Sequence, residues 1–155
     1  MPIKIAILAS GSGSNAENII NYFSNRPDFQ IPVILSNKSG AFVHQRAKNL
    51  KIPSFTFTKD EFEQGFPIVD FLKSYQIDFV VLAGFLLKVP KVLIDSFPKK
   101  IINIHPALLP KFGGKGMYGS RVHEAVKNAG ESESGISIHF VNENYDEGNI
   151  IFQAK

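Results

Sequence analysis

The sequence predicts an α/β fold: a Rossmann-like, open, mostly parallel sheet with helices on both faces. Three observations support this prediction. Short apolar runs alternate with longer amphipathic stretches, which is typical of βαβ units. The apolar run 79–83 is continuous, as in parallel strands that are covered on both faces. A glycine-rich turn follows the first apolar run and leads into a helical stretch, as in nucleotide-binding folds.

Length and composition favour one domain, covering residues 1–155. The chain has 155 residues, of which 44% are hydrophobic and 20% charged, enough apolar surface for a sizeable core. A net charge of +3 suits small anionic ligands rather than nucleic acid. The absence of cysteine excludes disulfides and thiolate sites. Without a signal peptide or a membrane-spanning stretch, we expect a cytoplasmic protein that binds small molecules and neither nucleic acid nor a membrane.

Towards the N-terminus, four segments are predicted as strands, at residues 3–8, 31–35, 54–58 and 79–83. Helices are predicted between them, at about residues 15–23, 41–50 and 60–75. Pro67 disfavours the early part of the third helix, because proline lacks an N–H donor. Gly84 closes the fourth strand.

The C-terminal half continues the alternation. We predict helices at residues 90–97 and 120–129 and strands at 101–105, 135–141 and 149–154. Pro90 suits the first turn of its helix, and Gly130 stops the later one. Lys155 comes directly after a strand, with no helix to cover that strand. We therefore expect a C-terminal element of the domain to be missing.

The glycine-rich turn is a candidate anion site. Because segment 11–16 links a strand to a helix, its backbone N–H groups can bind a phosphate. It formally fits a dinucleotide fingerprint, but the second strand leads into Lys38 rather than the acidic residue typical of NAD sites. NADP stays open, while the Ser and Asn side chains favour a terminal monophosphate. The alternative is a plain tight turn with Ser14 or Asn15 as helix N-cap.

Two polar side chains lie near the end of strand 101–105. Its period-2 alternation places Asn103 and His105 on one face. Ligand sites of open α/β sheets lie at the carboxyl ends of the strands. There an Asn amide can donate to a developing oxyanion and a His can move a proton. The alternative is that both side chains are structural.

Other polar residues give weaker signals. Asp146 lies in the turn 142–148, where a carboxylate that reached His105 would favour the protonated imidazole, although acidic residues also fill surface turns. His139 shares a strand face with Ser137 and either borders the site or is structural. We expect His44 and His123 to be surface or packing residues. Without a pair of histidines at ligand spacing, no metal site is predicted.

Five motifs follow one another along the chain: Gly11-Ser-Gly-Ser-Asn15, Val81-Leu-Ala-Gly-Phe85, Asn103-Ile-His-Pro-Ala-Leu-Leu-Pro110, Ser137-Ile-His-Phe-Val141 and Asp146-Glu-Gly148. Together they resemble the phosphoribosylglycinamide formyltransferases, a family of the folate-dependent formyltransferase superfamily, across essentially the whole chain. The resemblance implies an enzyme of purine biosynthesis with a Rossmann-like fold of the formyltransferase type. It would transfer the formyl group of the cosubstrate 10-formyltetrahydrofolate to the amine of glycinamide ribonucleotide, through a tetrahedral intermediate and without a metal.

The resemblance also implies roles for individual residues. Asn103 would stabilise the oxyanion, His105 would donate and shuttle the proton, and Asp146 would support the protonated His105 and order water. The substrate phosphate would lie on Gly13, Ser14 and Asn15. The folate would be held, largely by backbone groups, along two segments that comprise Leu86, Leu87, Lys88, Val89, Asn142, Glu143, Asn144 and Tyr145.

The sequence departs from the family pattern at three places. The family usually has Arg where this chain reads Leu87-Lys88, and Lys does not replace Arg in planar recognition. Glu61 stands at the position of a basic residue of the family, with Lys59 nearby. The family also continues several tens of residues past Lys155. Two alternatives therefore stay open: a non-catalytic phosphate- or nucleotide-binding α/β module, and another folate-dependent formyltransferase or hydrolase.

Overall fold

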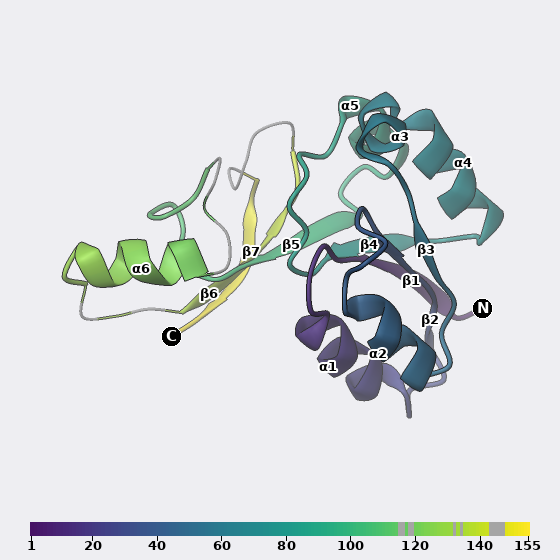
Figure 1. Cartoon of the computed structure of the whole chain (residues 1–155), viewed down its shortest axis with the longest axis horizontal. Coiled ribbons are helices and arrows are strands. Elements are labelled where there is room, and N and C mark those ends of the chain that lie inside the picture. Colours follow the sequence, from purple (N-terminus) through teal and green to yellow (C-terminus); the bar gives the residue numbers. More distant parts are fainter. Residues whose placement is uncertain (115–116, 118–119, 132, 134, 143–147) are drawn as a thin grey trace.

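The computed structural model describes residues 1–114, 117, 120–131, 133, 135–142 and 148–155. In this part of the chain, the strands form one sheet in the order β3-β2-β1-β4-β5-β6-β7 (Figure 1). The strands are β1 (Ile3–Leu8), β2 (Phe29–Ser36), β3 (Ser54–Thr56), β4 (Phe79–Leu82), β5 (Ile101–His105), β6 (Ile136–Phe140) and β7 (Ile150–Ala154). β1 to β5 are parallel, whereas β6 pairs antiparallel with β5 and β7 antiparallel with β6.

The helices between the strands cover both faces of the parallel part (Figure 1). They are α1 (Ser14–Phe23), α2 (Val43–Asn49), α3 (Lys59–Gln64), α4 (Phe66–Ser74) and α5 (Lys91–Ser96). A further helix, α6 (Ser120–Asn128), lies apart from the parallel strands and packs on Ala107. Each predicted element is present to within a few residues, apart from the helix at 60–75. The prediction of an open, mostly parallel sheet with helices on both faces is confirmed.

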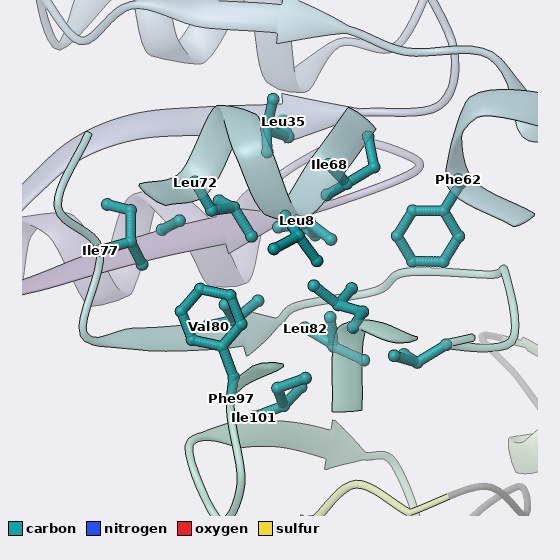
Figure 2. Close-up of a cluster of buried hydrophobic side chains, with 14 of the residues drawn as sticks. Leu8, Leu35, Phe62, Ile68, Leu72, Ile77, Val80, Leu82, Phe97 and Ile101 are labelled. Carbon is teal, nitrogen blue, oxygen red and sulfur yellow. The ribbon is translucent and has the colours of Figure 1, made fainter. Parts of the chain in front are cut away.

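Two of the three apolar clusters found among the described residues lie on opposite faces of the parallel part of the sheet. Alternate residues of β1 separate them: Leu8 faces α3, α4 and α5, whereas Ile7 faces α1 and α2. Figure 2 shows the first cluster, in which Leu72 of α4 and Phe62 of α3 pack over Leu8 and Leu82. Burial on both faces explains why the run 79–83, which includes β4, is continuously apolar.

The prediction of one helix at 60–75 is wrong. Thr58 caps α3 through a capping box with Glu61, and the helix ends at Gly65, whose φ is 81°. A Cβ on Gly65 would lie 2.9 Å from Val92 Cβ, so glycine permits both the left-handed backbone and the close approach of α5. Pro67 then lies in the first turn of α4, where its missing N–H costs no hydrogen bond.

The chain reverses its order around β1, and this reversal positions the functional site. β2 and β3 lie on one side of β1, whereas β4 and β5 lie on the other. In open α/β sheets such a switch point leaves a crevice at the carboxyl ends of the strands. The loop after β1 and the segments after β4 and β5 converge at that edge.

Candidate active site

One cavity of about 770 Å³ opens at the carboxyl ends of β1, β4 and β5. Its volume lies within the range of roughly 300–1,000 Å³ that is typical of small-molecule sites. The residues expected at the site from the sequence and found in its lining are Gly13, Ser14, Asn15, Leu86, Leu87, Lys88, Val89, Asn103, His105, His139 and Asn142. Segments that are far apart in the sequence therefore share one pocket.

The glycine loop reaches the cavity through a turn with positive φ, which glycine adopts without strain. Gly13 is the N-cap of α1, with φ at 76°, and a Cβ at this position would collide with the side chain of Val43. Ser14 and Asn15 are thus the first two residues of the helix, which corrects the alternative of either as N-cap. N–H groups in the first turn have no acceptor within their helix, so this end of α1 is suited to an anion.

Arg46 of α2 supports the loop from behind. Its Nε donates a 2.6 Å hydrogen bond to the carbonyl of Ser12, and its guanidinium forms an ion pair with Glu17 in the first turn of α1. Glu17 would otherwise leave a negative charge close to the anion-binding end of that helix. Arg46 was not expected from the sequence, because its role depends on the way α2 packs against the loop.

Ser10 joins the glycine loop to the segment after β4. Its hydroxyl accepts a 2.9 Å hydrogen bond from the Leu86 backbone N–H and donates to Asn37 Oδ1 at 2.6 Å. Ser10 is buried. One side chain therefore fixes the spacing between the candidate phosphate end of the cavity and the segment expected to hold the folate.

The face predicted for β5 is confirmed by the strand pairing. Asn103 lies opposite His139 of β6, and His105 lies opposite Ser137, so all four side chains lie on one face. His105 is 2% exposed, and its Nε2 lies 2.7 Å from the Phe112 carbonyl oxygen. Because a carbonyl only accepts, this nitrogen carries a proton and donates it to the bond.

Ser137 holds the chain that follows His105. Its buried hydroxyl donates to the Ala107 carbonyl at 2.7 Å and accepts from the Leu109 N–H at 3.0 Å. Gln153 of β7 donates to the same oxygen at 2.8 Å. The antiparallel strands β6 and β7 thereby shape the loop beside the candidate catalytic histidine.

His139 interacts with a candidate catalytic group. Its Nε2 lies 3.1 Å from Asn103 Nδ2, and its Nδ1 lies 2.9 Å from the Phe140 carbonyl oxygen. Of the two possibilities left open by the sequence, a residue that borders the site is the one the structure supports.

The remaining expectations have mixed outcomes. Asp146 lies outside the described residues, as do Glu143, Asn144 and Tyr145. His44 is a packing residue, within 2.8 Å of Ser54 Oγ. His123 is exposed but lines the cavity, which the sequence did not predict.

Arg121 and Met117 also line the cavity without having been expected there. No spacing signal could have found them, because the path of the chain after β5 decides which part of α6 faces the pocket. Lys38 is absent from the cavity lining in the part of the chain that the structure describes.

Among the described residues, no three His, Asp or Glu side chains cluster as the ligands of a metal ion would. No helix within the described ranges is long and apolar enough to cross a bilayer.

Comparison with known proteins agrees with this arrangement. The formyl transferase family model matches residues 3–155. The chain is 43% identical, over 97% of its length, to the chloroplastic phosphoribosylglycinamide formyltransferase of Arabidopsis thaliana, and it covers 54% of that protein. It is 39% identical, over 98% of its length, to the phosphoribosylglycinamide formyltransferase of Haemophilus influenzae, of which it covers 72%.

The crystal structure of phosphoribosylglycinamide formyltransferase from Bacillus halodurans matches with a TM-score of 0.86 and 36% identity, covering 97% of this chain and 78% of that one. The chain spans about half the length of the relatives from Arabidopsis thaliana and Vigna unguiculata. The family match extends over nearly every residue and includes the glycine loop and the β5 segment. This chain belongs to the formyl transferase family.

Proposed function

We propose that this chain is the catalytic part of a phosphoribosylglycinamide formyltransferase, an enzyme of purine biosynthesis. It transfers the formyl group of 10-formyltetrahydrofolate to the amine of glycinamide ribonucleotide. One observation carries the proposal: the glycine loop and the Asn103–His105 pair open onto the same cavity. A phosphate held at one end thus leaves the rest of the substrate facing the polar groups of β5.

The phosphate of the ribonucleotide binds at the N-terminus of α1. The backbone N–H groups of Gly13, Ser14 and Asn15 provide donors, and the helix dipole favours a negative charge there. The hydroxyl of Ser14 and the amide of Asn15 add side-chain donors. Both residues are exposed at the cavity.

The folate occupies the part of the cavity between β4 and β6. The segment Leu86–Val89 lines one side and Asn142 another, which combines apolar side chains with backbone donors and acceptors, as small-molecule sites do. Lys88 is exposed in this lining, within the Leu87-Lys88 stretch where the family usually has Arg. The expected contribution of residues 143–145 to this part of the site stays a prediction.

The reaction is a direct acyl transfer. The substrate amine attacks the formyl carbon, and a C–N bond forms as the carbonyl oxygen gains negative charge. Asn103 donates an amide hydrogen bond to this oxyanion, which is the largest single contribution that such sites make. The tetrahedral intermediate then breaks its C–N bond to N10 of the folate. N10 takes up a proton, while the attacking amine loses one.

His105 moves the proton between the two nitrogens. It lies two positions after Asn103 on the same strand face, and both residues line the cavity. Imidazole is suited to this step because it gains and loses a proton near neutral pH. Asp146 would stabilise the charged imidazole, and this role stays a prediction because the residue lies outside the described part of the chain. The cytoplasmic location is likewise still a prediction.

The test is formyl transfer from 10-formyltetrahydrofolate to glycinamide ribonucleotide, measured by the release of tetrahydrofolate with the protein at its natural length. We expect turnover, a loss of at least about 100-fold in kcat for His105→Ala and retained binding of both substrates. His44→Gln, a histidine outside the cavity, is the matched control and should retain full activity.

The same experiment separates the alternatives. If the protein binds a phosphorylated ligand but shows no turnover, and His105→Ala changes only its stability, then the chain is a non-catalytic binding module. Release of formate without transfer to the ribonucleotide would instead indicate a folate-dependent hydrolase.

A further inference from the structure

We propose that His139 is a positioning residue that holds the Asn103 carboxamide in the orientation needed to bind the oxyanion. The inference rests on the proposed function and adds a second residue to its oxyanion site. His139 and Asn103 lie directly opposite each other on the antiparallel strands β5 and β6. Their side chains meet at 3.1 Å, between His139 Nε2 and Asn103 Nδ2.

The direction of this hydrogen bond follows from the other nitrogen of the ring. His139 Nδ1 lies 2.9 Å from the carbonyl oxygen of Phe140, which only accepts, so Nδ1 carries the proton. In the neutral imidazole Nε2 is then an acceptor. Because Nε2 faces the NH₂ group of Asn103 rather than Oδ1, the amide nitrogen donates to the ring.

The contact with His139 fixes the orientation of the Asn103 carboxamide, with its NH₂ group towards His139. A carboxamide rotated by 180° exchanges its NH₂ group and its oxygen with almost no change of shape. With His139 as an acceptor, the rotated form would bring Asn103 Oδ1 against an unprotonated nitrogen. The observed form uses one N–H for His139 and leaves the second as a donor. A donor fixed in advance stabilises a developing oxyanion without reorganisation during the reaction.

The position of His139 favours this indirect role over proton transfer. The side chain is 2% exposed. Its proton is directed to the backbone of its own strand, and its lone pair is directed to Asn103. His139 therefore acts on the reaction through the amide. His105 is equally buried and also donates to a backbone carbonyl, so the feature that distinguishes His139 is that its other ring nitrogen is directed at Asn103.

Two substitutions test the contributions of the two ring nitrogens of His139 separately. His139→Gln keeps an acceptor at about the reach of Nε2, whereas His139→Asn keeps only a donor for the Phe140 carbonyl. We expect His139→Asn to lower kcat about 10- to 100-fold, a substantial part of the effect of losing an oxyanion donor, with the KM of both substrates unchanged. His139→Gln should recover most of this loss. His44→Asn serves as the matched control.

A double-mutant cycle decides whether His139 acts through Asn103. In the Asn103→Ala background we expect His139→Asn to cause no further loss of kcat, because its effect is coupled to the missing amide. Additive losses would overturn the proposal, since they would mean that His139 contributes to catalysis independently. A rise in KM with kcat unchanged would also overturn it.

A spectroscopic measurement tests the contact without any activity. In the ¹⁵N spectrum of the wild-type protein, His139 must show a protonated Nδ1 and an unprotonated Nε2, and the Asn103 side-chain NH₂ must shift in His139→Asn but not in His139→Gln. The opposite tautomer of His139, or an Asn103 side-chain chemical shift that is the same in the wild type and in both variants, would overturn the proposal. If these signals appear as expected but no turnover is found, the proposed function fails and the positioning contact stands.

Discussion

The hydroxyl of Ser10 accepts a hydrogen bond from the backbone N–H of Leu86 at 2.9 Å, across 76 positions of sequence. It donates at the same time to Asn37 Oδ1, so this buried group uses both its donor and an acceptor site. Through this contact the loop after β1 and the segment after β4 are held at a fixed distance. The two proposed substrate subsites are thus connected by one oxygen atom.

Removal of that oxygen should affect both subsites. We expect Ser10→Ala to lower the free energy of unfolding by about 1–3 kcal/mol, because the Asn37 amide and the Leu86 N–H lose a buried partner. The KM of each substrate should rise. Denaturant unfolding and steady-state kinetics measure the two effects. Ser24→Ala, which removes an exposed hydroxyl bonded to Asn21, should change neither quantity.

The turn at Gly13 should not tolerate a side chain. In Gly13→Ala the new Cβ would collide with Val43. The positive φ would also destabilise the folded state by about 1–2 kcal/mol, because alanine disfavours this backbone conformation. We expect weaker binding of the ribonucleotide and a lower melting temperature. Gly40→Ala is the control, since a Cβ there meets nothing within 4 Å. Equal KM values for the two variants would contradict the proposed phosphate site.

The ion pair between Arg46 and Glu17 should matter for phosphate binding more than for stability. Arg46→Met leaves Glu17 uncompensated beside the N-terminus of α1, and we expect the KM of glycinamide ribonucleotide to rise about 5- to 10-fold, which corresponds to about 1 kcal/mol. Kinetics at low and high salt should show that the effect shrinks as salt screens the charge.

A second substitution separates charge from loop support. Glu17→Gln in the Arg46→Met background should reverse the part of the KM increase that comes from repulsion between Glu17 and the phosphate. The part that comes from the lost hydrogen bond to Ser12 should remain. Lys59→Met breaks an exposed pair with Glu63 and should leave the KM unchanged. If Arg46→Met behaved like this control, the proposed support of the loop would be wrong.

Ser137 should stabilise the segment that follows His105. We expect Ser137→Ala to cost about 1–3 kcal/mol in unfolding free energy, because the Leu109 N–H and the Ala107 carbonyl lose a buried partner. Hydrogen exchange at Leu109 should accelerate strongly. Ser74→Ala, which removes an exposed hydroxyl from the end of α4, is a control at which no change is expected.

Local patterns in the sequence were sufficient to predict much of this fold and part of the site. The continuously apolar run 79–83 and the alternation of apolar with amphipathic stretches predicted the parallel sheet. The alternation within β5 placed Asn103 and His105 on one face, as the pairing with β6 confirms. The glycine loop was likewise predictable, because the need for a left-handed residue at Gly13 arises from the turn itself.

The contacts that depend on tertiary packing could not be predicted from local sequence patterns. Arg46 meets Ser12 across 34 positions, and nothing in the spacing of the two residues indicates that α2 packs behind the loop. The break at Gly65 was missed for a different reason. Thr58 and Glu61 form a capping box that marks where α3 begins, and Gly65 with Pro67 two positions later marks where it ends. The apolar pattern that continues from Phe62 to Leu72 nevertheless favoured one helix across this signal.

The antiparallel register of β5 and β6 brings Asn103 and His139 together over 36 positions of sequence. In a sheet, a slip of one residue would turn the His139 side chain to the opposite face. The proposed oxyanion site therefore forms only when this non-local pairing closes, and such contacts form slowly compared with local ones. During refolding from denaturant, we therefore expect activity to return no earlier than β5 pairs with β6, and later than the helices form.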